Sequence, residues 1–461
     1  MVPHKVPILD FPTEVLSDIF DHLAPGRKDL ASFFLDYSDI FAVRGTCRTF
    51  RAISSTLRLW YDDDFDLSDV VRGVLPRADG RIDVTDLEIG ERRLFACLAS
   101  DKVLLDTMSR KQHWSFRTVP TLIQYTDTIP NFRTTITKLN YEVYHSCQDL
   151  DELPQVSIND GLAHLGRLPN LTSLSISTEG GKICLNQIVV TCSSLKNLEF
   201  YQLENGWYSG SLSGLRRLEK LVVYDYQLPK KTGPRQHLLP IDSALSLTNL
   251  RFFARGTRNN VYHSKHLLNF INLTKLTVNP LCDRMCKTII SADFLHLRKF
   301  VAVIHGDTNI SLDDMLRLLQ SRSLNSLREL IFLVEPERWE FSIEHGYLEI
   351  IRTITSHLSN LEDLQLTTGI NTAWCELFSK SRNLKSIAWV CFEEECIDCT
   401  DMFTNPIDYM SDDSLEDMAS LVTEKLNAVF EQFVEKPSVY VKILSEEIYD
   451  QWDELFEEYD G

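Results

Sequence analysis

The sequence has no apolar run close to the roughly 20 residues that cross a membrane, and no basic start leading into an apolar stretch. Its eleven cysteines are odd in number and scattered rather than regularly spaced. These absences argue against a membrane protein and against a small secreted domain held together by disulfides. We therefore expect a protein of the reducing cytosol or the nucleus, with free thiols and no membrane partner.

Catalytic motifs are missing as well. The sequence has no glycine-rich phosphate loop with its lysine, no His-Glu-x-x-His, no Gly-x-Ser-x-Gly and no recognisable context for a nucleophilic cysteine. The cysteines closest to a metal-binding spacing are Cys375, Cys391, Cys396 and Cys399, and Cys282 with Cys286. A structural zinc site usually needs four ligands, and buried thiols are ordinary core residues. We expect neither an enzyme nor a metal or other cofactor.

Basic surface is scarce. The chain carries a net charge of −19, and residues 393–461 hold 21 acidic residues against three lysines and no arginine. That segment accounts for −18, so the first 392 residues are close to neutral. Because contact with phosphate requires basic side chains, we do not expect a nucleic-acid partner.

The N-terminal segment contains two sets of apolar residues at helical spacing. Pro12, Thr13 and Glu14 supply the start of a helix with an acidic first turn. Apolar residues recur through Leu23, and a second set runs from Ile40 to Trp60. These helices are too short and too few to bury that surface among themselves, so we expect a partner surface here.

The same segment carries FPTEVL, an Ile-Phe pair, TCRTF and a closing Leu-Trp, in that order. It resembles the F-box family, with a longer insert between Leu23 and Asp39 than that family usually has. The resemblance implies a small helical domain at 5–62 that docks on the Skp-type adaptor of a cullin-RING ubiquitin ligase; the alternative is an ordinary helical hairpin. The adaptor-binding residues that it implies are Phe11, Pro12, Val15, Leu16, Ile19, Phe20, Leu23, Val43, Cys47, Phe50, Ile53, Leu59 and Trp60.

From about Val84 a pattern Leu-x-x-Leu-x-x-Leu-x-Leu recurs along the chain. It resembles the leucine-rich repeat family over roughly 300 residues. The resemblance implies an α/β solenoid at 80–400, with parallel strands on a concave face and helices on the convex face. Helices are predicted at 311–323, capped by Ser311, and at 346–358. The first inward residues of the strands are predicted at Leu174, Leu198, Leu221, Phe253, Leu276, Phe300, Leu330, Leu364 and Ile387.

Residues that flank each inward residue are expected on the concave sheet, exposed to a client protein. They form an apolar patch, a pair of tyrosines and a row of lysines. The alternative is that another part of the chain covers the patch, or that the register is off by one residue. The client-binding residues predicted in this way are Tyr201, Tyr224, Val301, Val303, Ile331, Leu333, Lys220, Lys275 and Lys299.

The acidic end of the chain, 401–461, combines a helical stripe from Leu415 to Phe433, a strand-like SVYVKIL at 438–444 and a second amphipathic stretch up to Tyr459. We expect a polar cap on the last repeat. The alternative is that this acidic segment folds back over the lysine row.

These features predict a substrate receptor of an SCF-type ubiquitin ligase, with adaptor, cullin and RING subunits as partners and an unknown client on the repeats. The alternative is an F-box and repeat scaffold that binds the adaptor without ubiquitin transfer.

Overall fold

The computed structural model describes the greater part of the repeat region. The described residues are 50, 54–55, 84–116, 119–143, 158–178, 181–202, 206–225, 239–254, 266–304, 308, 310–334, 343–367, 377–378, 381–392, 420, 423–424, 426–428, 430–431 and 437–444. The chain divides into two compact units. Unit 1 comprises residues 1–218 and 229–236, and unit 2 comprises residues 219–228 and 237–461.

Unit 1 contains a parallel sheet in the order β1-β2-β3-β5 and a separate pair, β4-β6. Among the described residues, its helices are α5 (Val84–Leu98), α6 (Lys102–Met108), α7 (Val119–Thr128), α8 (Phe132–Thr135), α9 (Ile158–Leu165) and α10 (Leu185–Thr191). Its strands are β1 (His113–Phe116), β2 (Lys138–Val143), β3 (Ser173–Thr178), β4 (Gly181–Cys184), β5 (Asn197–Gln202) and β6 (Gly206–Ser209). Tyr141 of β2 points toward α9, because a Cβ at Gly161 would lie 2.4 Å from its hydroxyl. The predicted inward residues therefore lie on the face of the sheet that the helices cover.

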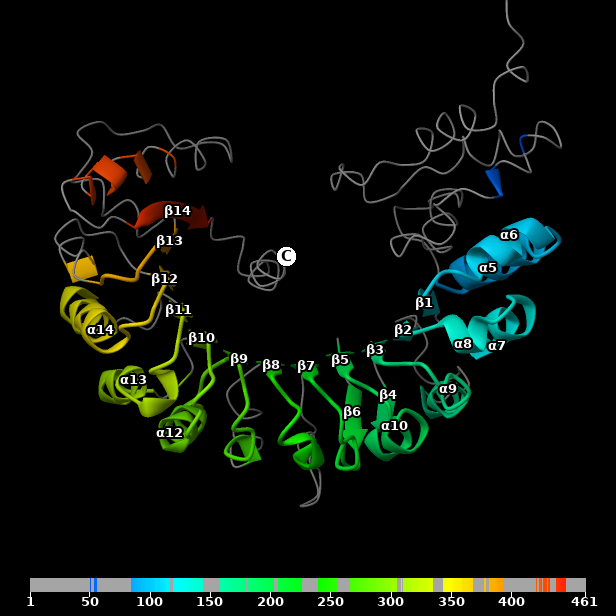
Figure 1. Ribbon diagram of the computed structural model, residues 1–461, viewed down its shortest axis with the longest axis horizontal. Helices are drawn as coiled ribbons and strands as arrows, with labels where there is room; N and C mark the ends of the chain where they lie inside the picture. Colours follow the sequence, from blue (N-terminus) through cyan, green and yellow to red (C-terminus); the bar gives the residue numbers. More distant parts are fainter. Residues whose placement is uncertain are drawn as a thin grey trace, which may run out of the picture. The chain divides into compact units, whose positions relative to one another are not determined.

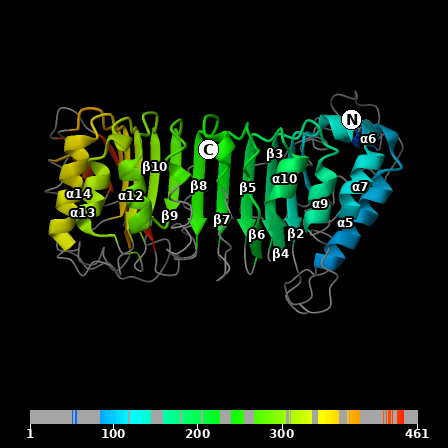
Figure 2. The same ribbon diagram turned by 90° about the horizontal axis from the view of Figure 1, so that it is seen from below.

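Unit 2 contains parallel strands that follow one another in chain order from β7 to β14. They are β7 (Lys220–Asp225), β8 (Asn249–Ala254), β9 (Lys275–Asn279), β10 (Lys299–Ile304), β11 (Glu329–Val334), β12 (Asp363–Thr367), β13 (Ser386–Phe392) and β14 (Ser438–Leu444). Helices α12 (Asp283–Ser291), α13 (Leu312–Leu319) and α14 (Ile343–His357) lie on one face of these strands (Figure 1). The strands run side by side in the same direction (Figure 2). The predicted α/β class with parallel repeating strands is confirmed.

The predicted helices are present, although the one predicted at 311–323 ends at Leu319. Ser311 is the N-cap of α13, and its hydroxyl accepts a hydrogen bond from the backbone N–H of Asp314 at 3.1 Å. This bond satisfies one of the free N–H groups in the first turn, as a capping serine should. The stretch predicted at 346–358 forms most of α14.

The register of one strand differs from the prediction. Leu221, Leu250 and Leu276 are aligned across β7, β8 and β9, and Phe253 is aligned with Tyr224. The inward residue of β8 is therefore Leu250, and the prediction of Phe253 was wrong. Two phenylalanines in NLRFFA fit the apolar pattern in either position, and only pairing with the neighbouring strands distinguishes them.

The turns before the strands are joined by a regular set of hydrogen bonds. The backbone carbonyl of Arg298 accepts from Arg328 N at 2.8 Å and from Glu329 N at 2.9 Å, and the same arrangement recurs from repeat to repeat. Side chains add to it, since the Asn360 amide donates to the Asn325 carbonyl at 2.9 Å and Asn383 to that of Ser359 at 2.7 Å. Each repeat thus supplies hydrogen-bonding partners for the next, which satisfies backbone groups that helices and strands leave free.

The C-terminal segment supplies the last strand. β14 pairs with β13 through Ile387 and Val439, so the strand predicted at 438–444 extends the repeat sheet. On its outer edge, Val441 N donates to the hydroxyl of Thr423 at 3.0 Å. Leu426 and Phe430, on the preceding helical segment, are buried. Helical side chains therefore occupy the free edge of this strand, which would otherwise be open to pairing with another chain.

Candidate protein-interaction surfaces

The predicted adaptor-binding residues lie outside the described residues, apart from Phe50, which is helical. Near this segment, Ser54 and Ser55 are fully buried. The Ser55 hydroxyl donates to Asp101 Oδ2 at 2.8 Å. The other carboxylate oxygen of Asp101 accepts from Val103 N and Leu104 N, so the same side chain caps α6. One carboxylate thus joins the N-terminal segment to α6.

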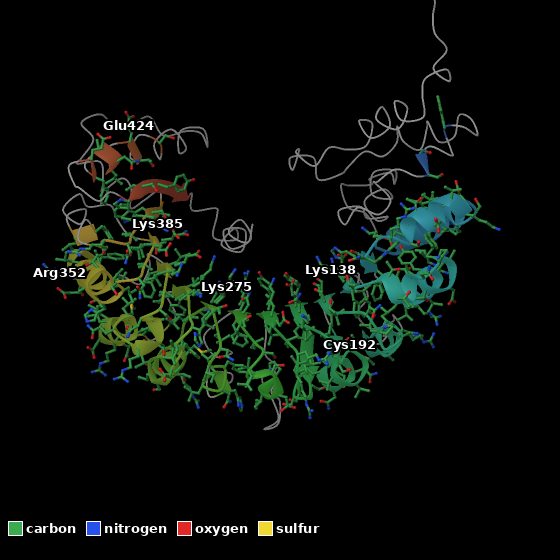
Figure 3. All side chains as sticks on the ribbon, in the orientation of Figure 1. Lys138, Cys192, Lys275, Arg352, Lys385 and Glu424 are labelled. Atoms are coloured by element: carbon green, nitrogen blue, oxygen red, sulfur yellow. The ribbon has the colours of Figure 1, made fainter. Side chains whose placement is uncertain are left out.

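The second candidate surface is the sheet face of unit 2 that lies opposite the helices. In the lysine row predicted there, Lys275 is aligned with Lys299, and Asn249 stands between Lys220 and Lys275. That these lysines bind a client stays a prediction. Asn249 belongs to this row because the inward residue of β8 is Leu250, which follows it. Figure 3 shows Lys275 on the side of the sheet away from the helices and Arg352 on the helix layer.

The apolar patch has the predicted register but not the predicted exposure. Val301 pairs with Ile331, and Val303 with Leu333, on β10 and β11. These four side chains expose 3, 4, 0 and 1% of their surface in that order. The expectation of an exposed patch was therefore wrong, and the alternative that the chain itself covers this face holds. Apolar side chains on both faces of a strand favour such burial, because leaving them in water costs free energy.

The two predicted tyrosines have different partners. Tyr201 donates from its hydroxyl to Glu199 Oε2 at 3.1 Å and is partly exposed. Tyr224 is buried and stacks on Phe253, with ring centroids 4.2 Å apart and planes inclined by 5°. Tyr224 therefore contributes to the packing of β7 on β8.

Charged side chains line the edge of unit 2 where its strands begin. Lys299 Nζ lies 2.8 Å from Glu329 Oε1, and Arg328 lies 3.3 Å from Glu362. Glu362 also accepts a hydrogen bond from Lys385, which lowers the pKa of the Glu362 carboxyl below its ordinary value. These charges link four successive repeats. The Arg328 and Lys385 side chains are exposed, so their ion pairs contribute little to stability.

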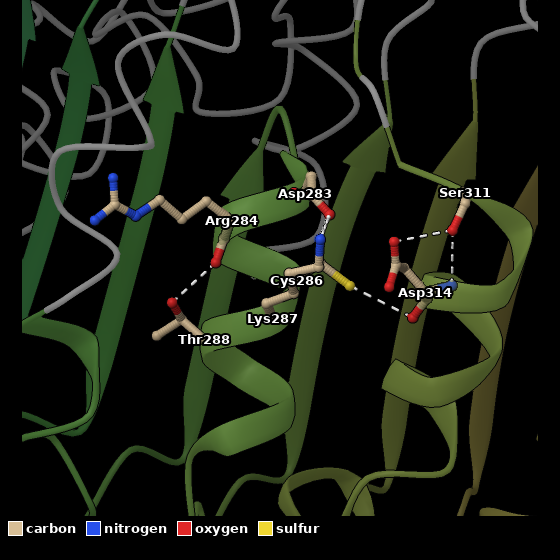
Figure 4. A network of polar contacts seen from close by, with 7 residues as sticks. All are labelled: Asp283, Arg284, Cys286, Lys287, Thr288, Ser311 and Asp314. Atoms are coloured by element: carbon tan, nitrogen blue, oxygen red, sulfur yellow. Dashed lines mark hydrogen bonds and ion pairs between the residues drawn. The ribbon is translucent and has the colours of Figure 1, made fainter.

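Two of the cysteines considered as metal ligands are packing residues. Cys282 and Cys286 are buried at the start of α12, and the Cys286 thiol donates to the Asp314 carbonyl of α13 at 3.5 Å (Figure 4). Burial raises the pKa of the Cys286 thiol to about 12. Among the described residues, no group of three or more His, Cys, Asp or Glu side chains is arranged to hold a metal ion. Cys391 has no described side chain, and Cys375, Cys396 and Cys399 lie outside the described residues.

One feature of the surface has no counterpart in the predicted sites. Leu245, Ile271 and Leu295 are exposed in three successive turns of unit 2. The signal is present in the sequence, since each stands two residues before the second leucine of its repeat. The repeat pattern assigns that position no role, and only the exposed surface distinguishes these residues from core leucines.

Within the described part of the chain, no helix combines the length and the apolar character needed to cross a bilayer.

Comparison with known proteins identifies one domain. A model of F-box-like domains matches residues 8–66, so the chain carries an F-box-like domain there. No curated protein sequence matches the chain. A solved structure similar to this chain is a crystal structure of a protein from Bacteroides fragilis, with 11% sequence identity, coverage of 72% of this chain and 86% of that one, and a TM-score of 0.29.

Proposed function

We propose that the chain is a substrate receptor of an SCF-type ubiquitin ligase. Its F-box-like domain binds a Skp-type adaptor and, through it, the cullin and RING subunits. Its repeats, which resemble leucine-rich repeats, bind a client protein. The match to F-box-like domains at residues 8–66 is the observation that carries the proposal.

The role proposed for the chain is positional. A receptor accelerates ubiquitin transfer by holding a client lysine near the ubiquitin-loaded enzyme, which raises the effective concentration of the reacting groups. The hydrogen bond between Ser55 and Asp101 supports this role, because it ties the N-terminal segment to the repeats. We propose that the chain itself is not an enzyme.

A second candidate function is a scaffold that binds the adaptor without ubiquitin transfer. The face around Val301 and Ile331, buried within the chain, favours this candidate, because it removes one surface that was expected to receive a client.

Co-purification separates the two functions. The full chain is captured with the adaptor, the cullin and the RING subunit present at equal concentration. A receptor retains all three subunits, whereas a scaffold retains the adaptor and lacks the cullin. Failure to retain the adaptor would contradict both candidates.

A further inference from the structure

Three exposed apolar residues occupy the same position in three successive repeats. Leu245, Ile271 and Leu295 each stand four residues before the first residue of β8, β9 and β10. Their exposed fractions are 75, 47 and 62%. Leu268, three residues before Ile271, is 45% exposed. We name these four residues the Leu245 stripe.

The members of the stripe lie in adjoining turns. The Asn272 side chain donates to the Leu245 carbonyl at 2.9 Å, which places Ile271 in the turn next to Leu245. Arg298 N donates to the Thr274 carbonyl at 2.8 Å, which places Leu295 in the turn next to Ile271. Because neighbouring strands are about 4.8 Å apart, the side chains form one continuous strip.

The fold does not require apolar residues at this position. The corresponding residues before β11, β12 and β13 are Asn325, Ser359 and Arg382, and those before β3 and β5 are Pro169 and Ser193. A single exposed leucine on a protein surface needs no explanation, but a contiguous group is typical of a partner site.

Unpaired positive charge borders the stripe on its strand side. Arg298 follows Leu295 by three residues, Lys275 follows Ile271 by four, and both are exposed. Neither side chain makes an ion pair or hydrogen bond with the described part of the chain. On the helix side, Asp242 and Asp293 precede Leu245 and Leu295 by three and two residues. The two signs of charge therefore lie on opposite sides of the stripe, with the cations toward the strands and the carboxylates toward the helices.

We propose that the Leu245 stripe docks an acidic amphipathic segment of a partner protein. Apolar side chains of the segment cover Leu245, Ile271 and Leu295, and its carboxylates face Arg298 and Lys275. Buried apolar anchors supply most of the affinity in such contacts, and complementary charges supply orientation and association rate. That this partner is the client rests on the proposed function.

A peptide with the sequence of residues 445–461 serves as the probe. It carries eight acidic residues, no basic residue, and apolar residues at helical spacing. The labelled peptide is added to the full chain and binding is followed by fluorescence anisotropy. The combined variant Leu245→Ser, Ile271→Asn and Leu295→Ser takes residue types that other repeats use at this position. We expect it to weaken binding about tenfold or more.

Charge variants test the orientation. Arg298→Thr should weaken binding of the peptide, since Thr274 occupies that position in the preceding repeat, and Asp293→Asn should strengthen it. Both effects should shrink as salt is added. Val190→Ser is the matched control, because Val190 is 78% exposed on α10, and Arg382→Ser is the control for charge. Neither control should alter binding.

Three results would overturn the proposal. The first is equal binding to the combined variant, or no binding at about 1 mM, the weak end of measurable affinities. The second is binding only to a chain that ends at Leu444, which would make the chain's own end the occupant. The third is stripe-dependent binding to phosphatidylserine vesicles in place of the peptide, which would indicate a membrane. Adaptor capture by the same variants should be unchanged, so loss of adaptor binding by the unaltered chain would instead contradict the proposed function.

Discussion

Asp101 accepts a hydrogen bond from the Ser55 hydroxyl at 2.8 Å while its other carboxylate oxygen caps α6. This single side chain therefore contributes both to the start of a helix and to the link between the N-terminal segment and the repeats.

Substitutions can separate the two roles of Asp101. Asp101→Ala should lower the free energy of unfolding by about 1–2 kcal/mol, because it removes a cap and leaves the buried Ser55 hydroxyl without this acceptor. Asp101→Asn should retain most of the cap, since asparagine is a good N-cap residue. Hydrogen exchange at Val103 and Leu104 measures the cap directly. Faster exchange in Ser55→Ala than in Asp101→Ala would contradict this assignment.

Adaptor binding should depend on the N-terminal domain alone. Replacing Pro12, Ile19 and Trp60 together by alanine should abolish capture of the adaptor, because each large interface side chain commonly contributes about 2 kcal/mol or more. Circular dichroism should show that the repeats remain folded. Unchanged adaptor affinity in the triple variant would refute the F-box assignment.

The last strand should depend on a side chain of the C-terminal segment. Val439 N donates to Asn427 Oδ1 at 3.1 Å, and Asn427 Nδ2 donates to the Val439 carbonyl at 3.2 Å. Asn427→Ala should speed hydrogen exchange at Val439 and lower stability by about 1–2 kcal/mol, since two hydrogen bonds are lost. Glu424→Ala, on the exposed side of the same segment, is the control and should leave that exchange unchanged.

The sheet face at β10 should behave as core. Val303 exposes none of its surface, so Val303→Asp should destabilise the chain by about 3 kcal/mol or more, because it buries a carboxyl without a partner. Leu295→Asp, in the same repeat but on the exposed stripe, should change stability by less than about 0.5 kcal/mol. Thermal unfolding measures both, and equal stability for the two variants would show that the face around Val303 is open.

The free energy of unfolding should fall at high pH because the pKa of the Cys286 thiol is raised in the folded chain. Its pKa is about 12 in the folded chain against an ordinary value of 9.0. Between those values the unfolded thiol gives up its proton while the folded thiol keeps it, so stability declines with rising pH. The decline from this group reaches about 1.4 kcal/mol per pH unit. Cys286→Ala should show a shallower slope above pH 9 in urea titrations, and the control Thr288→Ala should keep the full slope.

Local pattern in the sequence was sufficient for much of the fold. Apolar residues spaced three and two positions apart predicted the α/β repeats. Such spacing indicates which side chains are buried and which backbone conformation brings them to one face. The Ser311 cap was predictable for the same reason, because a capping serine acts within one turn of its own helix. The F-box assignment at the N-terminus likewise rested on closely spaced motifs.

Tertiary structure decided what the pattern left ambiguous. The register of β8 depended on pairing with β7 and β9, because NLRFFA offers apolar residues in more than one phase. The burial of Val303 and the exposure of Leu295 depended on what the rest of the chain covers, and an apolar residue carries no local signal of that. The chemistry of a side chain determines whether its burial is favourable. Only the packing of distant segments determines whether it is buried in the folded chain.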